Sequence, residues 1–324
     1  MKRNQTISSL AACFLMGLLI LDGKTALSGA SDGIALAIGT LIPSLFPFIF
    51  LSIWLSSSFS GGQIGIFSVL GRAFRMPKGT EVLLIPGFLG GYPTGAQAVG
   101  HAYSTGRISR ETGQRMLVFC NNAGPSFLFG MAAPFFPEVW MVWALWGFQM
   151  LGAWTSARLF PCSKATSVSL PAQNDPSPIA ALKKSVSVMA MICGWVVLFR
   201  VMIAFLDRWF LWLVPDAVRT MLIGLLELSN GICALGSVEQ IEIRFLLCCI
   251  LLSFGGLCVT MQTISVTPGL RLREYFWGKM VQITVSVGCG AALFYSPVFL
   301  IIPLCLQIPG ISQKRSGNPR LIGV

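Results

Sequence analysis

The sequence predicts an all-α polytopic membrane protein built from two inverted repeats, each with a re-entrant hairpin and a broken transmembrane helix. Three observations predict it: the composition is too apolar for a water-facing surface, bilayer-length apolar runs recur, and glycine- and proline-rich interruptions occur at corresponding places in both halves. Of 324 residues, 54% are hydrophobic and 11% are charged, whereas soluble domains carry about 25% charged residues. Most of the exterior must therefore face lipid.

The composition also excludes several kinds of site. The ten cysteines form no CxxC pair, and His101 is the single histidine, so we expect neither a disulfide framework nor a metal site. Phosphate-binding glycine loops and the HExxH and GxSxG motifs are missing from the sequence. We therefore expect no cofactor, no enzymatic activity and no nucleic-acid partner. The net charge of +11 is interpreted as a signal of membrane orientation.

Four apolar runs approach the ~20 residues that a helical span needs. The first, 8–21, resembles a signal peptide but is better interpreted as a retained helix, because polytopic proteins seldom need a cleaved signal. The uninterrupted runs lie at 8–21, 33–57, 140–157 and 185–206. A further run, 276–308, is either one long tilted helix or a tight helical pair.

Four other apolar segments are interrupted. Segment 81–100 contains two prolines and five glycines, too many for a plain helix. The other three carry polar or glycine breaks near their middles: Asn121-Asn122-Ala123-Gly124-Pro125-Ser126 in 116–134, Glu227-Leu228-Ser229-Asn230-Gly231 in 221–238, and Ser253-Phe254-Gly255-Gly256 in 245–266.

The distribution of positive charge predicts the orientation, because Lys and Arg concentrate on cytoplasmic loops. Basic residues flank 81–100 on both sides, at Arg72–Lys78 and Arg107–Arg115, so this segment is expected to enter and leave on the cytoplasmic side. Segment 221–238 is followed by Glu239 and Glu242 and is expected to enter from outside. This arrangement puts 15 of the 23 basic residues on cytoplasmic segments. Lys279 is expected to snorkel there, and His101 to have no special role.

The chain is thus expected to be a single integral membrane domain, 1–324. It comprises a first repeat at 33–157, a cytoplasmic linker at 158–184 and a second, inverted repeat at 185–308. Gly95 and Gly231 in the two hairpins are 136 residues apart, and Gly124 and Gly255 in the two breaks are 131 apart. Inverted repeats with broken helices are typical of secondary transporters, which bind substrate near the midplane.

Several motifs resemble those of a known family. They are Pro43-Ser44-Leu45-Phe46-Pro47-Phe48, Gly90-Gly91-Tyr92-Pro93-Thr94-Gly95, Phe119-Cys120-Asn121-Asn122-Ala123-Gly124-Pro125-Ser126-Phe127, and the Glu227–Gly231 and Ser253–Gly256 motifs above. Together they resemble the YlbJ-type sporulation integral membrane protein family, over nearly the whole chain. That family belongs with the nucleoside-recognition Gate domain proteins, similar in plan to concentrative nucleoside transporters. The resemblance implies transport of dipicolinic acid across the outer forespore membrane in a spore former.

Two ionisable residues in apolar segments are the leading site candidates, because charges in lipid are costly and usually functional. Glu227 is interpreted as a proton or charge sensor, with a carboxyl that merely holds the hairpin tip as the alternative. Arg200, near Trp195 and Phe199, could clamp a substrate carboxylate in bidentate fashion. Its alternatives are a structural pair with Glu227 and snorkelling toward Asp207.

Uncharged polar residues at the interruptions complete the candidate substrate site. Asn121, Asn122 and Ser126 supply donors and acceptors beside the Gly124-Pro125 break. Weaker candidates, each of which could instead hold helices together, are Tyr92, Thr94 and Gln97 in the first half and Ser229, Asn230 and Gln262 in the second.

The sequence therefore predicts a multi-pass cell-membrane transporter of a small anionic or polar metabolite, with dipicolinic acid as the substrate that the resemblance implies. A nucleoside-like substrate is the alternative within this class, and a non-transporting assembly factor for the spore envelope is the alternative from another class. The expected partners are the lipid bilayer, a small-molecule substrate and either a proton or a sodium ion. The sequence leaves open a homo-oligomer, the transport direction and whether the source organism sporulates.

Overall fold

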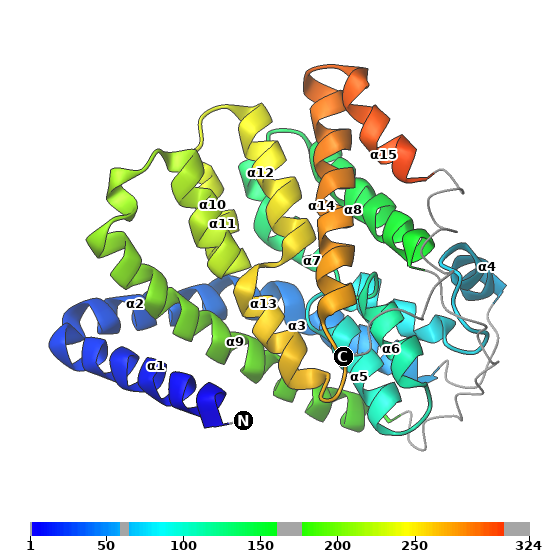
Figure 1. Cartoon of the computed structure of the whole chain (residues 1–324), viewed down its shortest axis with the longest axis horizontal. Helices are drawn as coiled ribbons and strands as arrows, with labels where there is room; N and C mark the ends of the chain where they lie inside the picture. The colour runs from blue at the N-terminus through cyan, green and yellow to red at the C-terminus, as the bar shows by residue number, and fades with distance from the viewer. Residues whose placement is uncertain (1, 59–64, 161–176, 308–324) are drawn as a thin grey trace.

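The described residues of the computed structural model, 2–58, 65–160 and 177–307, form helices and turns without a β-strand (Figure 1). The all-α prediction is confirmed for this part of the chain. Three helical runs in it are long and apolar enough to cross a membrane: Gly23–Ser58, Pro178–Trp209 and Ile241–Val266. Only 22% and 39% of the first two are buried, so their apolar side chains lie outside, as expected for a membrane protein.

The first of these runs follows α1 (Lys2–Leu21) and consists of α2 (Gly23–Leu36), the π-helical η1 (Ala37–Leu41) and α3 (Ile42–Ser58). It begins ten residues before the predicted span 33–57. The π-helical turn precedes Pro43, which has no N–H for a regular helical hydrogen bond. The Ile42 N–H accordingly donates to Ala37 O, five residues back. The helix thus accommodates its prolines without ending.

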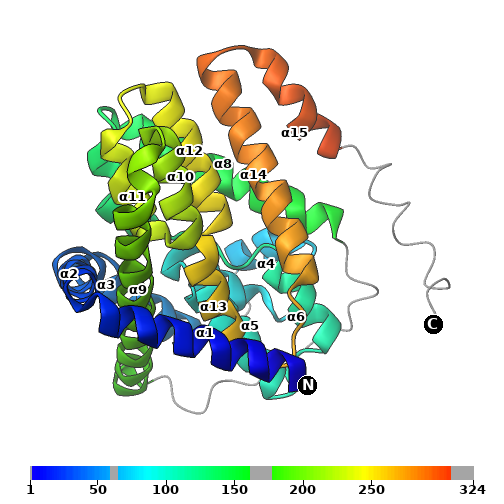
Figure 2. The ribbon, with the colours of Figure 1, turned by 60° about the vertical axis from the view of Figure 1, so that its left-hand side comes forward.

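Helix α9 (Pro178–Trp209) packs along α2 and α3, as Figures 1 and 2 both show. Gly29 and Gly33 permit the close approach, because a Cβ on Gly33 would lie 2.9 Å from Val197 Cα. Because α9 begins at Pro178, Lys183 and Lys184 of the predicted linker 158–184 are helical.

Two groups of short helical segments fold back on themselves. The first consists of η2 (Glu81–Leu83), η3 (Pro86–Gly90) and α5 (Thr94–Ser104), and the second of α10 (Asp216–Leu226) and α11 (Leu228–Ala234). We call these the first and second hairpin. Each closes on a pair of glycines: a Cβ on Gly95 would lie 2.7 Å from Gly87 Cα, and one on Gly231 would meet Gly224 Cα.

Two further segments are broken near their middles, as predicted. The first runs from α6 (Arg110–Leu117) through non-helical residues 121–124 to α7 (Pro125–Phe127), η4 (Leu128–Ala132) and η5 (Ala133–Phe135). The second consists of α12 (Ile241–Phe254) and α13 (Gly256–Val266). Its break requires glycine, because Gly255 and Gly256 have φ angles of +83° and +81°. We call residues 121–124 the first break and residues 255–256 the second break.

Helices α8 (Val139–Leu159) and α14 (Arg273–Phe294) pack against each other and against the broken segments (Figure 1). After α14 the chain turns through η8 (Pro297–Leu300) into α15 (Ile301–Leu306), which folds back beside α14 (Figure 2). Of the two alternatives for 276–308, the helical pair is therefore the one observed. The remaining elements are α4 (Gly65–Ala73), η6 (Leu211–Leu213) and η7 (Leu235–Ser237).

Candidate functional site

Both hairpin turns, the first break and the helix that follows the second break contribute to one central cavity with an empty volume of about 410 Å³. Tyr92 comes from the first turn, Gly124 from the first break and Glu227 from the second turn, while Gln262 follows the second break on α13. Apolar side chains of α3, α7 and α9 complete the wall: Leu45, Phe127, Ile192 and Val196. Polar groups are thus confined to the interrupted segments, which is the arrangement of a small-molecule site.

Glu227 forms the turn of the second hairpin and caps the following helix. Its carboxylate accepts hydrogen bonds from Ser229 N at 3.0 Å, from Asn230 N at 2.7 Å and from Asn230 Nδ2 at 2.7 Å. The side chain is 2% exposed. A carboxylate at the N-terminus of α11 satisfies N–H groups that have no intrahelical partner. Predicted candidates Ser229 and Asn230 therefore hold Glu227 in place, and all three lie close together.

Tyr92 connects the first hairpin to the second broken helix. Its hydroxyl donates to Leu252 O at 3.2 Å, and its ring packs over the second break, where a Cβ on Gly255 would lie 3.1 Å from Tyr92 Cζ. Thr94 acts within the same hairpin, because its hydroxyl lies 2.7 Å from both Pro86 O and Gly91 O. Of these two predicted candidates, Tyr92 faces the central cavity and Thr94 stabilises the turn.

The first break is held by Asn121, which is fully buried. Asn121 Nδ2 donates to Thr263 Oγ1 on α13 at 2.9 Å, and Asn121 Oδ1 accepts from Ala96 N on α5 at 3.4 Å. Asn122 Nδ2 donates to Phe119 O at 2.6 Å. Asn122 Oδ1 and Ser126 Oγ are buried without a hydrogen-bond partner among the described residues. Such atoms are uncommon in proteins and need an explanation.

Gln262 lies beside Glu227 in the wall of the central cavity. Its amide Nε2 contacts Cys258 Sγ at 3.3 Å, a weak interaction. Because the amide has no stronger partner among the described residues, it is available to a molecule in the cavity.

Lys279 was expected to snorkel toward the cytoplasm, and this prediction is wrong. Its side chain is fully buried. Lys279 Nζ donates to Asn121 O at 2.5 Å, to Tyr92 Oη at 2.7 Å and to Gln282 Oε1 at 3.2 Å. The neighbouring Gly278 lets α14 approach Val118 closely, because a Cβ there would lie 2.6 Å from Val118 O, and this part of α14 therefore faces the protein interior. The sequence signal was a lysine seven residues into an apolar helix.

Arg200 lies apart from the central cavity. Its guanidinium bonds Asp32 Oδ2 on α2 at 2.8 Å and lies 3.6 Å from Asp207 Oδ2 on its own helix. It neither lines the central cavity nor pairs with Glu227. The predicted substrate clamp therefore receives no support, and the contact with Asp207 agrees with the snorkelling alternative. An acid on a neighbouring helix, Asp32, satisfies a charge that the sequence alone left without a partner.

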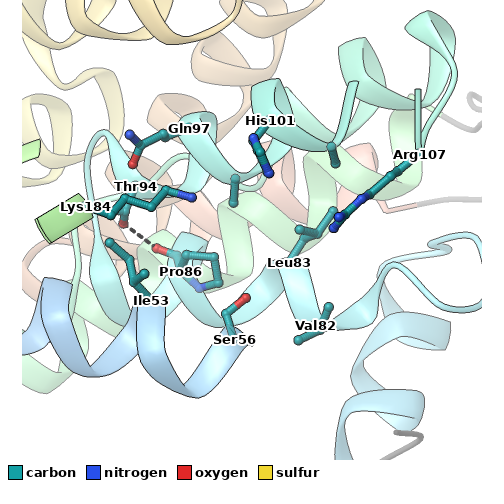
Figure 3. A pocket seen from close by; sticks show the side chains of 12 residues that line it. Ile53, Ser56, Val82, Leu83, Pro86, Thr94, Gln97, His101, Arg107 and Lys184 are labelled. Carbon is teal, nitrogen blue, oxygen red and sulfur yellow. Dashed lines mark hydrogen bonds between the residues drawn. The ribbon is translucent and has the colours of Figure 1, made fainter. Parts of the chain in front are cut away.

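A second pocket, with an empty volume of about 590 Å³, lies between α3, the first hairpin and the start of α9. His101, Arg107 and Lys184 point into it from three sides, and Gln97 lines it as well (Figure 3). The pKa of His101 is lowered, first by partial burial and then by the charges of Lys184 and Arg107. Gln97 and Thr94 thus belong to this basic pocket, whereas Tyr92 of the same hairpin lines the central cavity.

The cysteines of the described segments are free thiols. In the same segments, His, Cys, Asp and Glu residues form no cluster of three or more that could hold a metal ion.

Comparison of the chain with protein-family models, with curated proteins and with solved structures gives no match. The resemblance to the YlbJ-type family accordingly stays a prediction carried by the motifs.

Proposed function

We propose that this chain is a secondary transporter that moves a small anionic or polar metabolite across a cell membrane by alternating access. The observation that carries the proposal is the convergence of two hairpin turns and two broken segments, through the first break and through α13 after the second break, on the central cavity. Unpaired backbone groups in lipid cost several kcal/mol each, so broken helices occur at membrane depth only where they face protein or a wet cavity. Four interrupted segments around one cavity are more than a structural role needs.

The proposed inverted repeats are supported by equivalent glycines. In the first hairpin Gly87 packs on Gly95, and in the second Gly224 packs on Gly231. The first members of these pairs are 137 residues apart and the second members 136 apart. Each proposed repeat then has the same order of elements: a long helix, a hairpin, a broken helix and a second long helix.

Contacts between the halves also follow a two-fold pattern. The returning helix of the first hairpin, α5, contacts the second broken helix at α13, and the returning helix of the second hairpin, α11, contacts the first broken segment at η4. This exchange is expected if the repeats are inverted about an axis in the membrane plane. Each hairpin could then move with the broken helix of the other repeat, which provides a means of alternating access.

The proposed re-entrant topology rests on the charges around the hairpins. More bases flank the first hairpin than the second, which is flanked by acids as well as bases, so the hairpins are proposed to enter from the cytoplasmic and the external side, respectively. The chain would then cross a cell membrane several times, and in a sporulating organism this membrane would be the outer forespore membrane.

The basic pocket supports an anionic substrate. It lies beside the same hairpin whose turn reaches the central cavity, and the charged side chains of Arg107 and Lys184 converge in it beside His101. Convergent positive charge raises the local concentration of anions. Dipicolinic acid, with two carboxylates, is the substrate that the motif resemblance favours, with uptake into the forespore as the proposed direction.

Uptake of labelled dipicolinate by proteoliposomes tests the proposal. We expect wild-type protein to accumulate the label and Glu227→Gln to reduce the rate at least tenfold, because the turn charge at the central cavity is lost. Glu239→Gln is the matched control, because Glu239 is exposed beyond the hairpin. Folded protein that transports neither dipicolinate nor a nucleoside would contradict the proposal and favour the assembly-factor alternative.

A further inference from the structure

The amine of Lys279 is fully buried and has no acidic partner among the described residues. Its hydrogen-bond acceptors are a backbone carbonyl, a phenol and an amide, all neutral. The ammonium also lies 4.8 Å from the ring centroid of Tyr92 and 5.5 Å from that of Tyr275. Oxygen atoms and aromatic faces around a positive charge form the environment of a bound cation. A purely structural contact would be met at lower cost by an uncharged side chain.

The ammonium also lies at a place in the fold where a cation binds in secondary transporters. Asn121 O belongs to the first break, where the helix has ended and the carbonyl is free of a helical donor. Unwound carbonyls and the ends of half-helices coordinate the coupling cation in secondary transporters with broken helices. Lys279 Nζ therefore occupies the place that a monovalent cation would take.

The second break has a neutral counterpart. Gln149 Nε2 on α8 lies 3.5 Å from Leu252 O, just before the second break. Gln149 and Lys279 are 130 residues apart, and their acceptors Asn121 and Leu252 are 131 apart. The two contacts thus occupy equivalent places in the proposed repeats. A neutral amide is sufficient to bind the free carbonyl near the second break, so binding the carbonyl at the first break does not by itself require a charged side chain.

We propose that the ammonium of Lys279 is a covalently attached substitute for a coupling cation at the first break. This inference rests on the proposed transport function. It implies that the chain needs no sodium or potassium ion at this position, and that removing the side chain without filling its space creates a site for such an ion.

Two substitutions at one position test the inference. Lys279→Ala removes the charge and leaves space, whereas Lys279→Met removes the charge and fills the space. Thermal unfolding of each purified full-length variant is measured in NaCl, KCl and N-methyl-D-glucamine chloride at equal ionic strength. We expect NaCl or KCl to raise the Tm of Lys279→Ala by about 2–4 °C over the bulky cation. Lys279→Met and the wild type should show no such difference.

The matched controls are Lys183→Ala and Lys183→Met, because Lys183 is exposed on α9. An equal response of the two Lys279 variants to every salt, including failure of both to fold in all of them, would overturn the inference. Because this readout needs no transport, it separates the two proposals. A cation response without uptake rejects the transporter alone, and uptake without a cation response rejects the cation substitute alone.

Discussion

At the scale of single residues, the buried ionisable groups of Glu227 and Lys279 are satisfied in opposite ways. Glu227 accepts hydrogen bonds from the backbone of its own hairpin, so its charge fixes a local turn. Lys279 donates to groups on two distant segments, the first hairpin and the first break. Removing Glu227 should therefore affect one element, whereas removing Lys279 should affect the contact between elements.

Replacing Glu227 with alanine should lower the free energy of unfolding by roughly 2 kcal/mol. The change removes a helix cap and leaves buried N–H groups of Ser229 and Asn230 without acceptors. Chemical or thermal unfolding in detergent measures the effect, with Glu239→Ala as the exposed control. Equal stability of the two variants would show that the carboxylate does not hold the turn.

Sequence reasoning found part of the site at this scale. Glu227, Tyr92 and Asn121 were identifiable because charged or polar groups next to helix interruptions are rare in apolar segments. The direction that Lys279 faces was predicted wrongly, and the sequence left a substrate clamp and snorkelling open for Arg200, because hydropathy does not determine which way a helix faces. That direction is set by packing, such as the contact of Gly278 with Val118 and the ion pair of Arg200 with Asp32.

At the scale of helical elements, the interruptions were predictable and the boundaries were not. Glycine and proline have strong backbone preferences, so the breaks at Gly124 and Gly255 and the turn after Pro86 could be located from the sequence. The early start of the first long run, at Gly23, depends on packing against α9. From the sequence alone, a polar stretch such as 23–32 is interpreted as a loop, because the helix that it packs against is not known.

The glycine pairs that close the hairpins should not tolerate a side chain. In Gly231→Ala the new methyl group would meet Gly224, and such overpacking costs about 1–3 kcal/mol. Thermal unfolding measures this loss, and proteoliposome uptake should decrease with it.

The matched control is Gly147→Ala on α8, where a Cβ meets no atom within 4 Å. Helix propensity should make that variant more stable by up to about 1 kcal/mol. Equal stability of Gly231→Ala and Gly147→Ala would contradict the close contact between Gly231 and Gly224 in the second hairpin.

At the scale of the whole molecule, charge is distributed unevenly. The basic pocket should make the stability of the folded protein depend on pH. The pKa of His101 lies below its ordinary value of 6.5, so the folded protein binds this proton less tightly than the unfolded chain does. Stability should therefore fall as pH drops through 6.5 toward the lowered pKa. Thermal unfolding between about pH 7.5 and pH 5.5 should show this loss in the wild type.

His101→Gln should remove the loss, because this is the single histidine of the chain. Saturating dipicolinate should also reduce it in the wild type if the anion binds beside Lys184 and Arg107. A pH dependence that survives the substitution would assign the titration to another group.

The proposed opposite entry of the hairpins predicts opposite labelling. Single cysteines at Ser104, after the first hairpin, and at Ser237, after the second, would both be exposed. In a background without the native cysteines, an impermeant maleimide added to intact cells should label Ser237→Cys, and Ser104→Cys only after permeabilisation. Labelling of both from the same side would contradict the inverted topology.

The hydroxyl of Tyr92 accepts from Lys279 and donates to Leu252 O. Because Lys279 also binds Asn121 O in the first break, and Leu252 lies just before the second break, one phenol connects the two broken segments. Neither broken segment could therefore move without disturbing the other through the hydrogen bonds of Tyr92. If the chain is the proposed transporter, this connection would disfavour a pathway that is open to both sides of the membrane at once. Tyr92→Phe keeps the ring but removes both hydrogen bonds, so it would then let substrate leak through the protein without changing the fold.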